Sequence, residues 1–118
     1  MNTKKVLIVY DAGNQTYWEN KAEAIEAQIG PIDLILDQNI SKQKTFPGYD
    51  LVLVDVSDIE VLYRLIPKIH QELLQSRIIV ASSTPTWKQA REYIRLGAVN
   101  LIRKSADPLE TINALQTV

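Results

Sequence analysis

The sequence contains no cysteine and only one histidine, His70, among its 118 residues. Disulfides, thiolate nucleophiles and thiolate metal sites are therefore excluded, and a single histidine cannot build a multi-histidine metal centre. The chain also has no large excess of positive or negative charge. It has 13 Lys and Arg residues and 14 Asp and Glu residues, which gives a net charge of −1. A near-neutral chain lacks the basic surface that nucleic acids and anionic membranes require, so neither is expected as a partner.

Long apolar runs are also missing. The longest, such as Val6–Tyr10, fall far short of the roughly 20 residues that a membrane-spanning helix needs. The N-terminus has no apolar segment followed by a small-residue cleavage site, which predicts a cytoplasmic protein. The composition is otherwise that of a folded protein, 46% hydrophobic and 23% charged. Its length predicts one domain over residues 1–118.

Five short runs rich in Val, Ile and Leu recur along the chain. Because they are continuous rather than alternating, they predict strands that are covered on both faces. The runs are Val6–Tyr10, Ile32–Leu36, Leu51–Val56, Ile78–Ala81 and Val99–Ile102. Most are separated by stretches with helical spacing, whereas residues 37–49 have few apolar side chains and predict a short helix at most. This alternation predicts an α/β fold with a doubly wound, five-stranded parallel sheet and helices on both faces.

Local signals mark where the helices begin. Thr16–Glu19, Ser57–Glu60 and Asp107–Glu110 each fit a capping box, in which a short polar side chain and a later Glu bind free backbone amides. Thr84-Pro85 and Asp107-Pro108 also place proline at a first helical position. We therefore expect helices to start at these points.

Polar residues lie at the ends of four of the five predicted strands. In chain order they are Asp11, Asp55, Ser82 with Ser83, and Lys104. In an open parallel sheet the carboxyl ends of the strands share one edge, where ligands bind. Two neighbouring carboxylates repel each other unless a cation such as Mg²⁺ lies between them, and a lysine beside them can hold a phosphoryl oxygen. Each residue alone is more commonly a turn or cap residue, but together they predict a site.

Four segments resemble the receiver domain of bacterial two-component response regulators. They are Val6–Asp11, Tyr49–Asp55, Ile78–Ser83 and Ala90–Lys104, the last followed by Asp107–Glu110. The likeness covers essentially the whole chain and is strongest from Arg77 to Leu115. It implies the flavodoxin-like topology of receivers, with strand order 2-1-3-4-5.

The resemblance also implies roles for the strand-end residues. Asp55 would be the phosphoacceptor, Lys104 would pair with the attached phosphoryl group, and Ser82 would hydrogen-bond to it. Asp11, Asp55 and the backbone carbonyl of Ser57 would hold Mg²⁺. The catalytic capacity would extend at most to self-phosphorylation and autodephosphorylation, so whether the chain counts as an enzyme stays open.

The implied partners are proteins. A sensor histidine kinase or a phosphotransfer protein would supply the phosphoryl group in a two-component phosphorelay. The modified aspartate would then switch a docking surface around Ser82–Leu101 towards a downstream protein. Tyr93 and Arg95 lie in the helical part of this region, where receivers often meet their partners.

Four positions depart from the receiver pattern. Tyr10 replaces the first acid of the usual pair, Val56–Ile59 is shorter than the usual loop, Leu101 replaces an aromatic switch residue, and Ser105 replaces a proline. Tyr10 and Ser105 favour an alternative, a pseudo-receiver that docks proteins without control by phosphate.

A third interpretation is a flavodoxin-type FMN binder. The segment Leu7–Thr16 resembles that family's phosphate loop, which opens onto a helix N-terminus. However, Gln15 interrupts its Gly-Asn-Thr core and Asp11 would place a negative charge near the phosphate. Trp18 and Trp87 fit the core or interface face of a helix better than a stacking platform, and His70 is expected at the surface.

Overall fold

The computed structural model describes residues 3–42, 48–104 and 107–118. Five strands form one sheet in which every neighbouring pair is parallel. They are β1 (Val6–Tyr10), β2 (Ile32–Leu36), β3 (Leu51–Asp55), β4 (Arg77–Ser82) and β5 (Ala98–Arg103). Their order across the sheet is β2-β1-β3-β4-β5, which confirms the expected topology.

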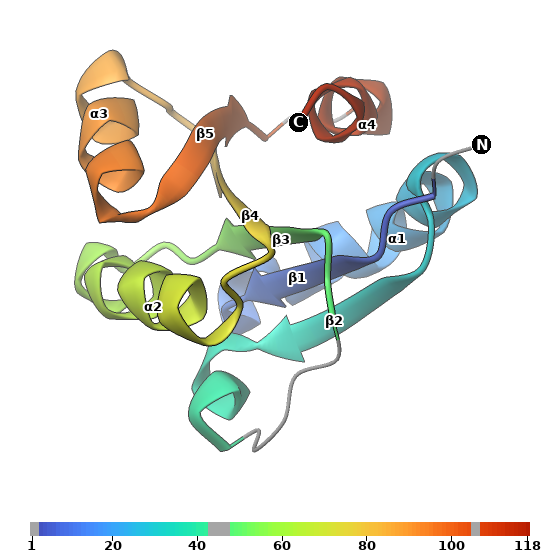
Figure 1. Cartoon of the computed structure of the whole chain (residues 1–118). Coiled ribbons are helices and arrows are strands. Elements are labelled where there is room, and N and C mark those ends of the chain that lie inside the picture. The colour runs from blue at the N-terminus through green and yellow to red at the C-terminus, as the bar shows by residue number, and fades with distance from the viewer. Residues whose placement is uncertain (1–2, 43–47, 105–106) are drawn as a thin grey trace.

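Helices cover both faces of the sheet (Figure 1). The α-helices are α1 (Gln15–Ile29), α2 (Ile59–Glu72), α3 (Trp87–Leu96) and α4 (Pro108–Gln116). Two 3₁₀ helices, η1 (Ala12–Asn14) and η2 (Asp37–Lys42), complete the elements. The short helix predicted after the second strand is confirmed as η2, while residues 43–47 of that region lie outside the described residues. Within the described ranges, no helix has both the length and the apolar character of a membrane span.

The sheet separates two apolar cores. On one face, Val54 of β3 packs in a cluster with Ile66 of α2 and Tyr93 of α3. On the other face, Ile8 of β1 packs with Ile25 of α1 and with α4. All five residues of β1 and of β3 are buried, because helices cover both sides of these central strands. This double burial is why their sequences are continuous apolar runs.

Two helix starts differ from the predicted ones. The N-cap of α1 is Asn14, so the helix begins before the expected cap at Thr16. The N-cap of α3 is Thr86, whose side chain forms a capping box with Gln89, two residues after the expected cap at Thr84. In both cases the true cap is a short polar residue that competes with a similar one two positions away.

The remaining two starts lie close to the expected positions. Asp107 caps α4 and Pro108 occupies its first turn, as predicted. Asp58 rather than Ser57 caps α2, through a 2.9 Å hydrogen bond from the Glu60 amide. The backbone amide of Ser57 is therefore available to donate a hydrogen bond to Asp11.

Candidate functional site

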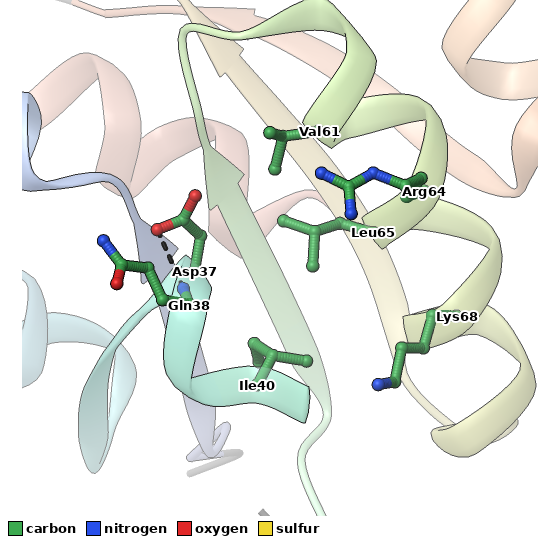
Figure 2. A pocket seen from close by; sticks show the side chains of 7 residues that line it. All are labelled: Asp37, Gln38, Ile40, Val61, Arg64, Leu65 and Lys68. Atoms are coloured by element: carbon green, nitrogen blue, oxygen red, sulfur yellow. Dashed lines mark hydrogen bonds between the residues drawn. The ribbon is translucent and has the colours of Figure 1, made fainter. Parts of the chain in front are cut away.

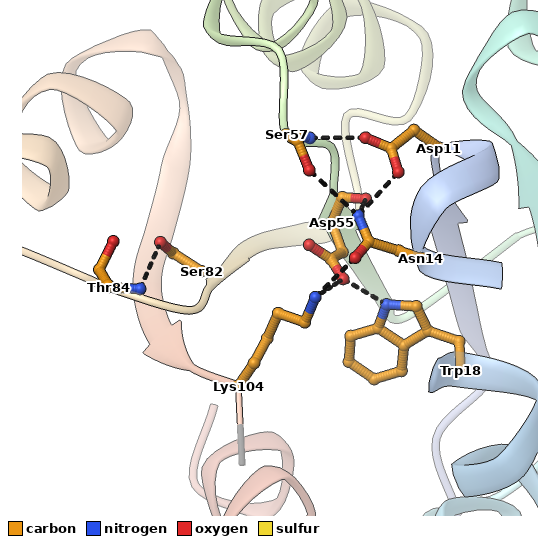
Figure 3. Close-up of polar contacts among 8 residues, drawn as sticks. All are labelled: Asp11, Asn14, Trp18, Asp55, Ser57, Ser82, Thr84 and Lys104. Carbon is orange, nitrogen blue, oxygen red and sulfur yellow. Dashed lines mark hydrogen bonds and ion pairs between the residues drawn. The ribbon is translucent and has the colours of Figure 1, made fainter. Parts of the chain in front are cut away.

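The carboxyl ends of β1, β3 and β5 bring the expected polar residues to one edge of the sheet (Figure 3). Asp11 follows β1, Asp55 ends β3 and Lys104 follows β5. The backbones at this edge are joined as well, because the Asp11 amide donates to the Asp55 carbonyl at 3.3 Å. The Lys104 amide donates to the carbonyl of Ser82 at the end of β4 at 2.8 Å. The strand ends are therefore held in register.

Asp55 is buried, with 3% of its surface exposed. Its Oδ2 atom forms a 3.0 Å ion pair with Lys104 Nζ and accepts a 2.6 Å hydrogen bond from Trp18 Nε1. Burial raises the pKa of the Asp55 carboxyl above its ordinary value, and the nearby Asp11 charge adds to the rise. The hydrogen bonds from Lys104 and Trp18 and the charge of Lys104 oppose it. The carboxylate is thus costly to bury but directly neutralised.

Lys104 is fixed from three sides. Besides its ion pair with Asp55, its Nζ atom donates a 2.7 Å hydrogen bond to Asn14 Oδ1. The same ammonium lies over the Tyr17 ring, 4.6 Å from the ring centroid, within the range of a cation–π contact. The N-cap and the first turn of α1 therefore supply two of the three partners that position the lysine.

Among the described interactions, the Asp11 side chain does not contact Asp55 or Lys104. The side-chain amide of Asn14 lies between Asp11 and this pair. Asp11 Oδ1 accepts a 2.7 Å hydrogen bond from Asn14 Nδ2, and Asp11 Oδ2 accepts one of 2.7 Å from the Ser57 amide. Asn14 thus links Asp11 to the Asp55–Lys104 pair (Figure 3). The structure therefore brings Asp55 and Lys104 into direct contact, whereas Asp11 reaches this pair only through Asn14.

Ser82 lies on the wall of the same site. A hollow of about 250 Å³ is lined by polar residues that include Asp55, Ser57, Ser82, Ser83, Thr84 and Lys104. The Ser82 hydroxyl accepts a 3.2 Å hydrogen bond from the Thr84 amide, and no described contact joins it to Asp55 or Lys104. The hollow gives an incoming group access to the buried carboxylate.

Two of the positions that depart from the receiver pattern, Tyr10 and Leu101, pack in the apolar cores. Tyr10 is buried in the core between the sheet and α1, so the side chain in place of the usual acid carries no charge to the site. Asp58 caps α2 with its carboxylate and so does not replace that acid. Leu101 is half-buried and packs against the core under α2 and α3. Ser105 lies outside the described residues.

Two residues of the site were not predicted from the sequence. Trp18 was expected in a helix core, and its ring is buried there, but its indole N–H also reaches Asp55. Asn14 was concealed by the competing cap at Thr16, and a turn-forming Asn three residues after a strand-end Asp is the signal that could have revealed it.

The residues present fit the chemistry of a hard divalent cation. Asp11, Asp55 and Ser57 offer carboxylate and carbonyl oxygens, which Mg²⁺ and Ca²⁺ prefer. Among the described residues, no group of three or more acidic, histidine or cysteine side chains could hold a metal ion, so the donor set stops at two carboxylates. The Asn14 amide already donates to one of these oxygens, Asp11 Oδ1, at 2.7 Å.

A second hollow, of about 310 Å³, lies between η2 and α2 (Figure 2). Its lining combines Asp37 with Arg64 and Lys68 around an apolar floor that includes Ile40 and Leu65. It contains none of the strand-end residues predicted from the sequence. We therefore place the candidate site at the Asp55 hollow.

No protein-family model matches the sequence, and no curated protein matches it significantly. Solved structures do. A response-regulator receiver domain from Methanospirillum hungatei JF-1 superposes with a TM-score of 0.79 at 17% identity, over 98% of this chain and 93% of that one. The chain has the receiver-domain fold. At this level of identity the similarity establishes the fold and leaves the chemistry to the site itself.

Two further solved structures have a similar fold. A response regulator from Burkholderia pseudomallei, solved with a phosphorylated aspartic acid, a calcium ion and citrate, has a TM-score of 0.77 at 22% identity. The match covers 96% of this chain and 67% of that one. A pilus assembly protein from Burkholderia thailandensis E264 has a TM-score of 0.73 at 16% identity, over 98% of this chain and 97% of that one.

The Trp18–Asp55 hydrogen bond predicts a measurable contribution to stability. Trp18→Phe removes the N–H donor and part of a buried ring. We therefore expect the free energy of unfolding, measured in urea, to fall by about 2–3 kcal/mol. Trp87→Phe is the control, because Trp87 is 76% exposed, and it should change stability by less than about 0.5 kcal/mol. Equal effects of the two substitutions would contradict the assigned bond.

The raised pKa of Asp55 predicts the direction of a pH dependence. The folded protein binds this proton more tightly than the unfolded chain, so ionising Asp55 costs stability as the pH rises towards the folded-state pKa. Asp55→Asn should therefore raise the thermal midpoint at pH 7 by roughly 2–5 °C.

This gain should shrink as the pH is lowered and disappear below about pH 3, where the Asp55 carboxyl is protonated in the unfolded chain as well as in the folded protein. Asp50→Asn, just before the opposite end of β3, is the matched control and should not raise the midpoint. A lower midpoint for Asp55→Asn than for the wild type at pH 7 would contradict the assignment.

Proposed function

We propose that this chain is a response-regulator receiver that accepts a phosphoryl group on Asp55 from the phosphohistidine of a sensor kinase or phosphotransfer protein. The observation that carries the proposal is the 3.0 Å ion pair between Asp55 and Lys104, which opens onto a hollow shared with Ser82. Phosphoryl transfer depends mainly on positioning and on neutralising the phosphoryl oxygens, and this arrangement supplies both.

The two carboxylate oxygens of Asp55 have different surroundings. Oδ2 holds both Lys104 and Trp18, whereas no hydrogen bond among the described residues reaches Oδ1, drawn on the Ser82 side in Figure 3. Oδ1 is therefore the proposed nucleophile. It attacks phosphorus, the P–N bond to the donor imidazole breaks, and the electron pair of that bond leaves with the imidazole. The product is an acyl phosphate on Asp55.

The neighbouring residues would stabilise this product. Lys104 would neutralise a phosphoryl oxygen, and the Ser82 hydroxyl would donate to another after leaving its contact with Thr84. A divalent cation at the site would be held by Asp11, Asp55 and the Ser57 carbonyl, and would supply further neutralisation of charge.

The proposed output is a docking surface on α3 and β5. Trp87, Ile94 and Val99 are exposed apolar side chains of these elements, near the strand that ends at Ser82. Arg95 is exposed and paired with Glu92 at 2.6 Å. Tyr93, expected on this surface, is instead buried against the core under α2 and α3. A downstream protein would meet this surface in a phosphate-dependent way.

A second candidate is a pseudo-receiver that docks proteins independently of phosphate. Two observations favour it. Tyr10 is buried where receivers place an acid, and the Asn14 amide already satisfies Asp11. In this case Asp55 and Lys104 would serve as a structural ion pair.

Phosphorylation is tested by intact-mass measurement after treatment with acetyl phosphate and Mg²⁺. The wild type should gain the mass of one phosphoryl group, because Asp55 is neutralised and open to the hollow. Asp55→Asn should gain none. Asp58→Asn is the matched control, since Asp58 caps α2 three residues away, and should be modified like the wild type. A folded wild type without adduct would support the pseudo-receiver instead.

A further inference from the structure

The side chain of Asn14, at the start of α1, has an unusual orientation for an N-cap residue. It is the N-cap residue, a place where Asn normally accepts a hydrogen bond from an amide of the first turn. Its side chain makes no such bond. The carboxamide instead turns into the strand-end site, between Asp11 and Lys104 (Figure 3). The helix therefore lacks a side-chain capping hydrogen bond, and the Asn14 amide bonds to the charged residues of the site instead.

The amide nitrogen lies among oxygens. Asn14 Nδ2 donates to Asp11 Oδ1 at 2.7 Å, and makes longer contacts of 3.4 Å with the Asp55 carbonyl oxygen and with Ser57 Oγ. Asp11 Oδ1 is itself one of the proposed cation ligands, while the other two contacts are to atoms beside the proposed ligands, the Asp55 carboxylate and the Ser57 carbonyl. An amide N–H₂ group carries a partial positive charge and two donors, so it satisfies part of the demand that a cation would meet.

The neighbouring charges fix the orientation of the carboxamide. Its Oδ1 accepts from Lys104 Nζ at 2.7 Å, and an ammonium can only donate. On the other side the Asp11 carboxylate can only accept. Reversing the amide would set oxygen against oxygen and nitrogen against nitrogen, so a single orientation is stable.

We propose that the Asn14 carboxamide occupies the place of the divalent cation, and that a cation binds only after this side chain has left. This inference rests on the cation site of the proposed function. Asn14 is then the residue that sets the cation affinity of the domain. In its resting state Lys104 neutralises Asp55 and the amide hydrogen-bonds to Asp11, so the fold does not require the metal.

Cation binding in this scheme exchanges one set of contacts for another. Asp11 would give up its bond to Asn14, and Lys104 would lose one of its acceptors while keeping Asp55. Removing the carboxamide abolishes these opposing contacts in the cation-free state. A shorter side chain at position 14 should therefore bind cations more tightly.

The test is a Mg²⁺ titration of variants built on Trp87→Phe. The chain has two tryptophans, so Trp18, whose indole binds Asp55, becomes the only indole reporter. Binding is followed by Trp18 fluorescence and by the amide resonance of Ser57, which donates to Asp11. Asn14→Ala should bind Mg²⁺ at least about tenfold more tightly than the parent, a change of about 1.4 kcal/mol.

Asn14→Ser is a second variant, because serine is a favoured N-cap residue and preserves the start of the helix. It should bind at least about fivefold more tightly than the parent, a change near 1 kcal/mol. Gln15→Ala is the matched control, since Gln15 bonds to Glu19 on the helix surface, and its affinity should stay within about twofold of the parent. Adding Asp11→Asn to Asn14→Ala should abolish the gain.

Unchanged or weaker Mg²⁺ binding in both Asn14 variants, or a gain that persists without Asp11, would overturn this inference. The intact-mass assay on the same proteins separates it from the proposed function. An adduct on Asp55 with no gain in Mg²⁺ affinity would reject the role of Asn14 alone. No adduct on any variant, with the gain present, would reject phosphoacceptance while the cation competition stands.

Discussion

A buried carboxylate at the end of a central strand is the constraint around which the site is organised. Asp55 closes β3, which helices cover on both faces, so its charge is taken out of water and must be neutralised by the protein. Lys104 provides the neutralising charge from the end of β5, two strands away. The parallel sheet makes this contact possible, because its strands deliver their carboxyl ends to one edge.

Helix α1 completes the arrangement. Trp18 joins Lys104 on one oxygen of Asp55, and Asn14 connects Lys104 to Asp11. Asn14 is the N-cap of this helix and Trp18 lies in its first turn, so the position of the charged groups depends on where the helix begins. The same contacts leave one oxygen of Asp55 facing the hollow. In the proposed function, this oxygen is the nucleophile.

The sheet could be predicted because double burial leaves a clear mark, the continuous apolar runs such as Val6–Tyr10. Strand polarity predicted that Asp55 and Lys104 share one edge of the sheet, and the resemblance to receivers implied that the lysine acts beside the aspartate. The contributions of α1 could not be predicted. Periodicity placed Trp18 in a core but says nothing about the direction of its indole N–H, which depends on the rotamer and on packing. The helix start was misplaced because Thr16 also begins a capping pattern, and this error concealed Asn14.

A double-mutant cycle between Asp55 and Lys104 tests the central claim most directly. The stability of wild type, Asp55→Asn, Lys104→Met and the double variant is measured by urea unfolding at pH 7. If the two side chains form the buried ion pair described here, removing Lys104 should cost at least about 1.5 kcal/mol more when Asp55 is present than when it is Asn. An equal cost in both backgrounds would show that the charges do not meet, and would contradict the account.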